Sequence, residues 1–237
     1  MTFGKIARRP TGIPNLDPLI EGGLPVNSFI VLVTDPDIAA EHFVRQFVYE
    51  GLRLGEGIVY CSVVRPPSYI RRDFEYFGLS VESYEKKGQL IFVNSYDTTN
   101  HGRNVLNVTS ESLAGLSDGI NKAIDLLRGF QIKRSVCDST ADALLTLKTE
   151  HLPDFARSRR EVRSSYPMIM LHLMLKGIRD EFLSPLKHHC DGFFELQVQQ
   201  GPQEVNRFLR IGKMRLTDFP TRLYPLRVTK DRVEVTV

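Results

Sequence analysis

The sequence predicts an α/β protein with a mainly parallel sheet, helices on both faces of that sheet, and antiparallel strands at the C-terminal end. Two observations predict this class. Short runs of Ile, Val and Leu alternate with amphipathic helical patterns through most of the chain, and this alternation is typical of a parallel sheet. The last part instead contains extended segments with no long helix between them, as antiparallel strands do.

The strands of the parallel sheet are expected where short apolar runs are bounded by polar or turn residues. Five runs fit this description: Ser28–Thr34, Gly57–Ser62, Gln89–Ser95, Ile132–Asp138 and Pro167–Leu173. The antiparallel segments, with Gly201-Pro202 as one turn, are Phe193–Val198, Val205–Met214, Leu223–Val228 and Val233–Val237.

Helices are expected between these strands. The first carries Phe43, Val44, Phe47 and Val48 on one face, and the second begins at Pro67, a residue suited to a first helical turn. The clearest helical pattern covers Ser110–Gly129, where apolar residues recur at steps of three and four. Thr140–Ser165 is long, polar and interrupted by Pro153, so we expect a helix and a loop there.

The bulk composition indicates one domain in a reducing, cytoplasmic environment. A chain of 237 residues with a net charge of +3 has enough length for one large core, and its charge is too small to indicate nucleic acid or a membrane surface. The longest apolar run, Met168–Leu175, is too short to cross a bilayer. The three cysteines are far apart and form no CxxC pair, so neither a disulfide framework nor a zinc site is predicted.

The segment after the first strand lies where nucleotide-binding chains place a glycine-rich phosphate loop. Its eight residues are Asp35, Pro36, Asp37, Ile38, Ala39, Ala40, Glu41 and His42. They include no glycine, which would let the backbone curl around phosphate, and no lysine. The position therefore resembles a phosphate loop that has lost the residues that hold phosphate.

Three separated stretches resemble the KaiC/RadA branch of the RecA-type ATPases, especially the stand-alone KaiC-like proteins of archaea. The first is TGIPNLD (residues 11–17) with EGGLP (21–25). The second is QFVYEG (46–51) with GEGIVYCS (55–62) and Pro66-Pro67, and the third is IGKMRLTD (211–218) closing on PLRVT (225–229). This resemblance covers nearly the whole chain. It implies one RecA-type P-loop NTPase core, residues 1–237, whose relatives form rings with ATP between neighbours.

In that family the loop after the first core strand carries the Walker A pattern GxxxxGK[ST]. Asp35 stands here at the first glycine. Alignment on the preceding strand places Glu41 at the lysine and His42 at the hydroxyl residue, whereas alignment on Gln46 places Ala40 and Glu41 there. Either alignment removes the lysine that would contact the outer phosphates.

Carboxylates in this loop oppose a triphosphate. Asp35, Asp37 and Glu41 place up to three of them there. One like-charge contact at about 4 Å costs roughly 4 kcal/mol at an effective dielectric of about 20. A helix N-terminus returns only about 0.3–1 kcal/mol to an anion. An alternative is that Asp35 or Asp37 caps the helix expected to begin near Ile38.

The acidic pair that follows the second core strand in the family, and activates the attacking water, is also missing. Val64 and Arg65 stand at these positions, and neither accepts a proton from water at neutral pH. Asp138 matches the Walker B aspartate that holds the magnesium water shell, although an aspartate before Ser139 could simply cap the next helix.

Two further groups of basic residues are candidate contacts. Lys213 and Arg215 match the Lys-x-Arg pair that reaches the neighbouring subunit's nucleotide in the family, and they could instead dock on a partner's acidic loop or lie on a solvated strand. The second group is the basic stretch that contains Arg157, Arg159, Arg160 and Arg163. One hypothesis is that this stretch contacts nucleic acid, but no aromatic residues are interleaved for base stacking.

We therefore expect a catalytically inactive KaiC-like homologue that acts as a regulatory or protein-interaction module in signal transduction. Its expected partners are itself or an active KaiC/RadA-like relative, with no cofactor, no metal and no membrane. His188 and His189 have no second ligand pair at metal-site spacing. The alternatives are a weak ATP-binding protein or residual ATPase using Mg²⁺, and a RadA-paralogue-like accessory protein of DNA recombination.

Overall fold

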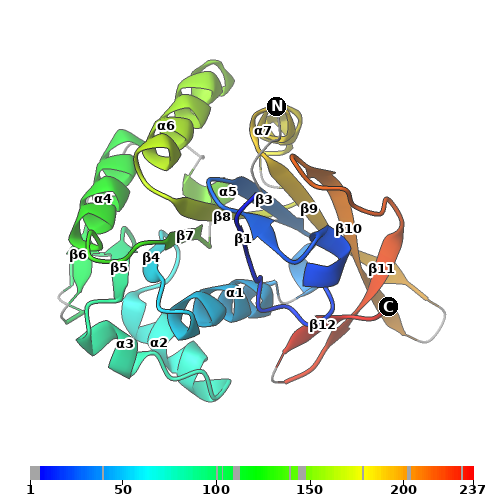
Figure 1. The fold of residues 1–237 in the computed structure, drawn as a ribbon, viewed down its shortest axis with the longest axis horizontal. Helices are drawn as coiled ribbons and strands as arrows, with labels where there is room; N and C mark the ends of the chain where they lie inside the picture. The colour runs from blue at the N-terminus through cyan, green and yellow to red at the C-terminus, as the bar shows by residue number, and fades with distance from the viewer. Residues whose placement is uncertain are drawn as a thin grey trace.

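The computed structural model describes residues 6–38, 40–99, 101–102, 104–108, 113–138, 140–143, 148–177, 179–201, 204–230 and 232–237. Within these ranges the parallel strands are β3 (Phe29–Thr34), β4 (Gly57–Ser62), β5 (Leu90–Asn94), β6 (Val105–Asn107), β7 (Lys133–Cys137), β8 (Met168–Leu175) and β9 (Gly192–Gln200). The antiparallel strands are β10 (Val205–Met214), β11 (Leu223–Val228) and β12 (Val233–Val235). They form one sheet in the order β12-β11-β10-β9-β3-β8-β7-β4-β5-β6 (Figure 1).

The predicted class is confirmed, because β9, β3, β8, β7, β4, β5 and β6 pair in parallel, whereas β9, β10, β11 and β12 pair in antiparallel fashion. Strand β9 thus joins the parallel and antiparallel parts of the sheet. All five predicted core strands are present within two residues of their expected bounds. The predicted strands do not include β6 or a short separate pair, β1 (Arg8–Arg9) with β2 (Leu24–Pro25). These strands have only two or three residues, too few to show a period.

Helices cover both faces of the sheet (Figure 1). The α-helices are α1 (Glu41–Arg53), α2 (Pro67–Tyr76), α3 (Glu82–Lys86), α4 (Leu113–Leu126), α5 (Thr140–Ala143), α6 (Leu152–Ser165) and α7 (Leu183–His189). Four 3-10 turns are η1 (Asp17–Ile20), η2 (Pro36–Ile38), η3 (Thr149–His151) and η4 (Asp180–Phe182). None of the helices in the described ranges has the length and apolar character needed to cross a membrane.

The core divides into two clusters, one on each face of the sheet. Phe43 of α1 and Phe74 of α2 pack with Ile30 of β3, whereas Ile120 of α4 packs in the second cluster with Val31 of the same strand. Neighbouring residues of a strand point to opposite faces. The fully buried β3 therefore has apolar residues at successive positions, which explains why it shows no alternation.

The expectation that Pro153 interrupts its segment is wrong. Pro153 lies in the first turn of α6, which runs unbroken to Ser165. A proline there loses no helical hydrogen bond, because the first N–H groups of a helix have no partner within it. Residues 144–147 of the same segment lie outside the described part of the chain.

Gln46 on α1 joins three distant segments. Its Nε2 donates to the carbonyls of Gly12 and Val233 at 3.1 Å, and its Oε1 accepts from the Val233 N–H at 2.6 Å. Gly12 has φ +79°, and a Cβ there would lie 2.7 Å from the Gln46 carbonyl oxygen. The glutamine and the glycine thus bring the N-terminal segment and β12 onto the same helix.

Candidate functional site

The candidate site lies at the carboxyl edge of the parallel strands. Asp35 follows β3, Arg65 lies in the turn after β4, Asp138 follows β7 and Lys176 follows β8. The carboxyl ends of parallel strands meet at one edge of a sheet, so the topology brings together residues that are more than 100 positions apart. This is the edge at which open α/β sheets bind ligands.

The loop after β3 is attached to the strand β9 beside it. The Asp35 N–H donates to the Leu196 carbonyl at 3.1 Å, and Asp35 Oδ2 accepts from the Val198 N–H at 2.7 Å. Lys176 Nζ lies 3.1 Å from Asp35 Oδ1. The chain then forms η2, with Ile38 and Ala40 buried against the core. The loop is therefore held by contacts with β9, with Lys176 and with the apolar core of the same chain.

The interpretation of Asp35 as a helix cap is wrong. The α1 helix begins at Glu41 instead of near Ile38, and Ala40 before it has helical φ and ψ with no side-chain capping bond. The Asp35 carboxylate is instead occupied by β9 and Lys176. Ala39 and the side chain of Asp37 lie outside the described residues, so the role of Asp37 stays a prediction.

The first two turns of α1 face α2 through a cluster of rings and charges. The His42 ring lies 4.4 Å from the ring of Phe77, and the Arg45 guanidinium lies 4.2 Å from the same ring. Arg45 Nη1 is 3.8 Å from Asp73 Oδ2. Burial, together with the positive charge of Arg45, lowers the pKa of His42. His42 is thus an aromatic contact at the position to which alignment on β3 assigns the magnesium-binding hydroxyl of the family pattern.

Asp138 is buried against two residues of the β4 segment. Tyr60 Oη donates to Asp138 Oδ2 at 3.1 Å, and Arg65 Nη2 lies 3.5 Å from the same oxygen. Arg65 Nη1 also lies 3.3 Å from Asp73 Oδ2. Whether Asp138 caps α5 depends on Ser139, which lies outside the described residues.

The charges in this network shift its protonation equilibria. Burial and the Asp138 carboxylate raise the pKa of Tyr60 well above its usual value. Burial tends to lower the pKa of Arg65, but Asp138, Tyr60 and other acidic groups outweigh burial, so the pKa is raised. Arg65 therefore remains a cation that donates hydrogen bonds and cannot act as a general base.

Three members of this site, Arg45, Asp73 and Tyr60, are not among the residues predicted from the sequence. Arg45 lies one helical turn after Glu41, and Asp73 lies two turns into α2. A charged residue among the apolar positions of an amphipathic helix was the available indication for Arg45, since such a residue is rarely buried without a partner.

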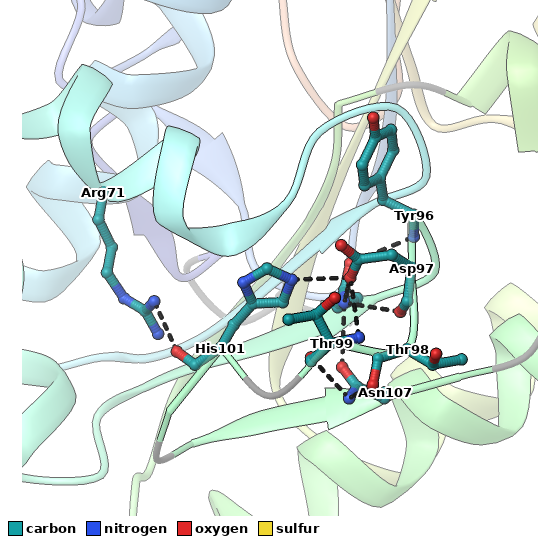
Figure 2. A network of polar contacts seen from close by, with 8 residues as sticks. Arg71, Tyr96, Asp97, Thr98, Thr99, His101 and Asn107 are labelled. Carbon is teal, nitrogen blue, oxygen red and sulfur yellow. Dashed lines mark hydrogen bonds and ion pairs between the residues drawn. The ribbon is translucent and has the colours of Figure 1, made fainter.

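A second polar network follows β5 at the same edge of the sheet (Figure 2). Asp97 Oδ1 lies 2.7 Å from His101 Nε2 and accepts from Asn94 Nδ2 at 3.0 Å. Arg71 on α2 donates to the His101 carbonyl at 2.8 Å, and Asn107 on β6 donates to two carbonyls of the loop. Hydrogen bonds from Asn94 and His101 lower the pKa of Asp97. These contacts join the loop to α2 and β6.

Lys213 and Arg215 lie at the opposite edge of the sheet. Met214 pairs with Gly192, which pairs with Ile30 near the start of β3, so the five residues from Ile30 to Asp35 place roughly 17 Å of strand between the pair and Asp35. Lys213 Nζ donates to the carbonyls of Lys187 and His188 at 2.7 and 3.0 Å. These carbonyls belong to the last turn of α7, where a cation is stabilising.

Arg215 is the more exposed member of the pair. Its Nη1 lies 3.6 Å from Asp191 Oδ1, and 55% of its side chain remains exposed. Because of their position, Lys213 and Arg215 can meet an acidic loop like that at residues 35–42 only on another molecule. This contact between molecules remains a prediction.

The four arginines of the basic stretch do not share one surface, so that part of the nucleic-acid hypothesis is wrong. Arg157 and Arg160 are exposed on α6, but Arg159 and Arg163 are buried. Arg159 Nη2 donates to Ser117 Oγ at 2.6 Å, and Arg163 Nη2 lies 3.0 Å from Asp191 Oδ2. Their four-residue spacing with Phe155 was the indication that they lie on the core-facing side of the helix.

No group of three or more His, Cys, Asp and Glu side chains is placed to hold a metal ion in the described ranges. The rings of His188 and His189 are 5.2 Å apart and nearly perpendicular. Cys61, Cys137 and Cys190 are buried and form no disulfide.

Comparisons with known proteins find one family that matches nearly the whole sequence. The model of the family described as "ATPase: KaiC" matches residues 9–237. The UPF0273 protein of Thermotoga maritima is 26% identical over 235 residues, covering 94% of this chain and 93% of that protein. UPF0273 protein PH0284 of Pyrococcus horikoshii is also 26% identical, with coverages of 94% and 91%.

A solved structure shows the same fold. The crystal structure of KaiC-like protein PH0186 from Pyrococcus horikoshii superposes with a TM-score of 0.80 at 22% identity, over 98% of this chain and 100% of that one. The mainly parallel sheet with antiparallel C-terminal strands is thus a RecA-type fold of the KaiC-like kind. Since the family model covers nearly all of the sequence, this chain belongs to the KaiC family of RecA-superfamily ATPases.

Proposed function

We propose that this chain is a KaiC-family domain that does not hydrolyse ATP and acts through contacts with other proteins. One observation carries the proposal: Arg65 stands where the family pattern has an acidic residue, with its guanidinium 3.5 Å from Asp138. The water-activating carboxylate is replaced by a group that cannot accept a proton. The same group neutralises the aspartate that would hold the magnesium water shell.

The phosphate loop supports the proposal independently. A triphosphate approaching it meets Asp35, whose nearest cation, Lys176, is already paired with that carboxylate. Breaking this pair to engage phosphate exposes the nucleotide to a like charge, at a cost of about 4 kcal/mol for a contact of about 4 Å. Loss of the loop and loss of the base are separate changes, and each removes a group that the family pattern uses in ATP hydrolysis.

Calorimetric titration of the purified chain with ATP and ADP, with and without Mg²⁺, tests the first half of the proposal. We expect no heat of binding and no shift in melting temperature up to millimolar nucleotide. We also expect no release of phosphate from ATP by the wild-type chain. The same result is expected for an Arg65→Glu variant, which restores the acidic residue but not the phosphate loop. An active KaiC-family ATPase serves as the positive control.

Binding by the wild-type chain with a Kd below about 100 µM, equivalent to roughly 5.5 kcal/mol, would contradict the electrostatic argument. Such binding without phosphate release would favour a nucleotide-binding module. Phosphate release would favour a residual ATPase.

The proposed partner is a second copy of this chain or an active KaiC/RadA-like relative, and the proposed role is regulatory. The exposed Arg215 supports such a contact, because its ion pair with Asp191 is long, at 3.6 Å, and leaves 55% of the side chain exposed. Sedimentation velocity of the wild-type chain, alone and mixed with an active relative, measures the association. Arg215→Glu is expected to weaken it, whereas Arg157→Glu on the exposed side of α6 is the matched control. Identical association of the Arg215→Glu variant and the wild type would overturn this part.

A further inference from the structure

Two cysteines lie beside each other on neighbouring strands below the candidate site. Cys61 of β4 and Cys137 of β7 are direct partners in the parallel register, and 0% and 2% of these residues is exposed. Their side chains are hydrogen-bonded to each other. Partners on adjacent strands lie about 4.8 Å apart, within the Cα separation of about 4.4–6.8 Å that a disulfide spans.

A buried cation accompanies the two thiols. Arg159 is 1% exposed, and its guanidinium contacts the hydroxyls of Ser117 and Ser158 and the ring of Phe155. No carboxylate of the described residues forms an ion pair with it. Its charge acts on both Cys61 and Cys137. The hydrogen bond with Cys137 and burial raise the pKa of Cys61 well above its usual value, and the charge of Arg159 opposes this shift, because a cation stabilises the thiolate, the reactive state of cysteine, as it forms.

We propose that Cys61 and Cys137 form a reversible intrachain disulfide when the protein meets a peroxide. The thiolate of one cysteine attacks the O–O bond, so that an S–O bond forms and hydroxide leaves and takes up the proton released by the thiol. The sulfur of the second cysteine then attacks the sulfenic sulfur. The S–S bond forms, the S–O bond breaks and the oxygen leaves as water. Two electrons pass from the thiols to the peroxide, which ends as two water molecules.

The position of the pair favours a switch over a permanent crosslink. The Cα spacing already suits a disulfide, but the bond also requires the two Cβ atoms to be about 3.8 Å apart, whereas the Cβ atoms of directly paired strand residues are about 4.5–5.5 Å apart, so the two cysteines must tilt toward each other. A bond strained in this way is more easily reduced. A small oxidant is favoured because both thiols lie under α4 and α6.

The crosslink would act directly on the candidate site. Cys61 follows Tyr60 and Cys137 precedes Asp138, while the Asp138 N–H donates to the Cys61 carbonyl at 3.2 Å. Tilting Cys61 and Cys137 toward each other at this point shifts their chain neighbours and displaces the Tyr60 and Arg65 contacts of Asp138. The redox state of the two cysteines would thereby change the surface at the carboxyl edge, whether or not that edge binds nucleotide.

Peptide mapping of the wild-type chain tests the proposal without any substitution. The folded protein is treated with hydrogen peroxide, denatured, alkylated and digested under non-reducing conditions. We expect one crosslink that joins the peptides of Cys61 and Cys137, an alkylated Cys190, and full recovery of three thiols after dithiothreitol. Alkylation of all three thiols, oxidation of the pair to sulfinic or sulfonic acid, or a crosslink through Cys190 would overturn the proposal.

Cys190 provides the matched control, because it is equally buried but has no neighbouring thiol in the described residues and contacts the Lys187 carbonyl at 3.6 Å. Cys190→Ser should form the same crosslink as the wild type, whereas Cys61→Ser should form none. Arg159→Lys retains the charge and should oxidise at the wild-type rate, and Arg159→Met should oxidise several-fold more slowly. Equal oxidation rates in the two folded Arg159 variants would show that the Arg159 charge does not assist the oxidation.

Discussion

The Asp35 carboxylate accepts a hydrogen bond of 2.7 Å from the backbone N–H of Val198, a residue 163 positions later in the chain. A residue at the first glycine position of a phosphate loop here fastens that loop to the neighbouring strand. The contact gives the aspartate a structural role and explains why a carboxylate is tolerated at this place.

Removing the Asp35 side chain should destabilise the protein. In Asp35→Ala the Val198 N–H loses a charged acceptor, and we expect the free energy of unfolding to fall by about 2 kcal/mol. Urea unfolding monitored by circular dichroism measures this change. Lys176→Met removes only the partly exposed ion pair and should cost less than about 1 kcal/mol. Equal effects of the two substitutions would show that the backbone hydrogen bond contributes little.

The buried pair of Glu56 and Arg134 should be among the most sensitive positions. Arg134 is fully buried, forms an ion pair with Glu56 through Nε, and donates to the carbonyls of Phe47 and Pro10 at 2.8 and 3.0 Å. Glu56→Gln leaves an uncompensated buried charge, and we expect a loss on the order of 3–5 kcal/mol in unfolding free energy.

Arg53→Gln is the matched control for that substitution. The Arg53 side chain is 61% exposed in its pair with Glu50, so its loss should change the free energy by less than about 1 kcal/mol. If the Glu56→Gln variant were as stable as Arg53→Gln, the buried charge of Arg134 would not be destabilising without Glu56, and the prediction would be wrong.

His172 should make stability fall as the pH is lowered. Burial, and then the charges of Arg159 and Arg163, lower its pKa to about 3, whereas an unfolded histidine has a pKa of about 6.5. Between these values the unfolded state binds a proton that the folded state excludes. The contribution is therefore absent above pH about 6.5, and it destabilises the protein by about 1.4 kcal/mol per pH unit as the pH falls toward about 3.

Chemical denaturation at several pH values isolates this contribution. His172→Leu should show a flatter loss of stability below pH about 6.5 than the wild type, because leucine does not titrate. His151→Leu, at an exposed histidine, should follow the wild-type curve. A wild-type slope in the His172→Leu variant would show that His172 is protonated in the folded protein.

Substitution of two arginines three positions apart on α6 should change the free energy of unfolding by very different amounts. Arg163 is buried, and its Nη2 lies 3.0 Å from Asp191, so Arg163→Met should cost about 3 kcal/mol in unfolding free energy. Arg160 is exposed, so Arg160→Met should change that free energy by no more than about 0.5 kcal/mol. Thermal or urea unfolding of both variants makes the comparison, and similar losses would contradict the burial of Arg163.

The sequence predicted the strands well because their pattern is local. Five apolar runs bounded by turn residues became β3, β4, β5, β7 and β8. The short β1, β2 and β6 were missed because two or three residues carry no period. The proline in α6 misled the analysis because its effect depends on its position in the helix, which the sequence of a polar segment does not reveal.

The sequence by itself determined that the loop at residues 35–42 has neither the glycines nor the lysine of a phosphate loop, and that Arg65 replaces an acid, because these are questions of chemical identity. Only the tertiary structure decided what the replacing side chains do. Asp35 meets Val198 and Lys176, Arg65 meets Asp138, and Arg159 enters the core beside two thiols. The physical reason is that these partners come from strands and helices far apart in the chain, and only the packing of the sheet sets the distances between them.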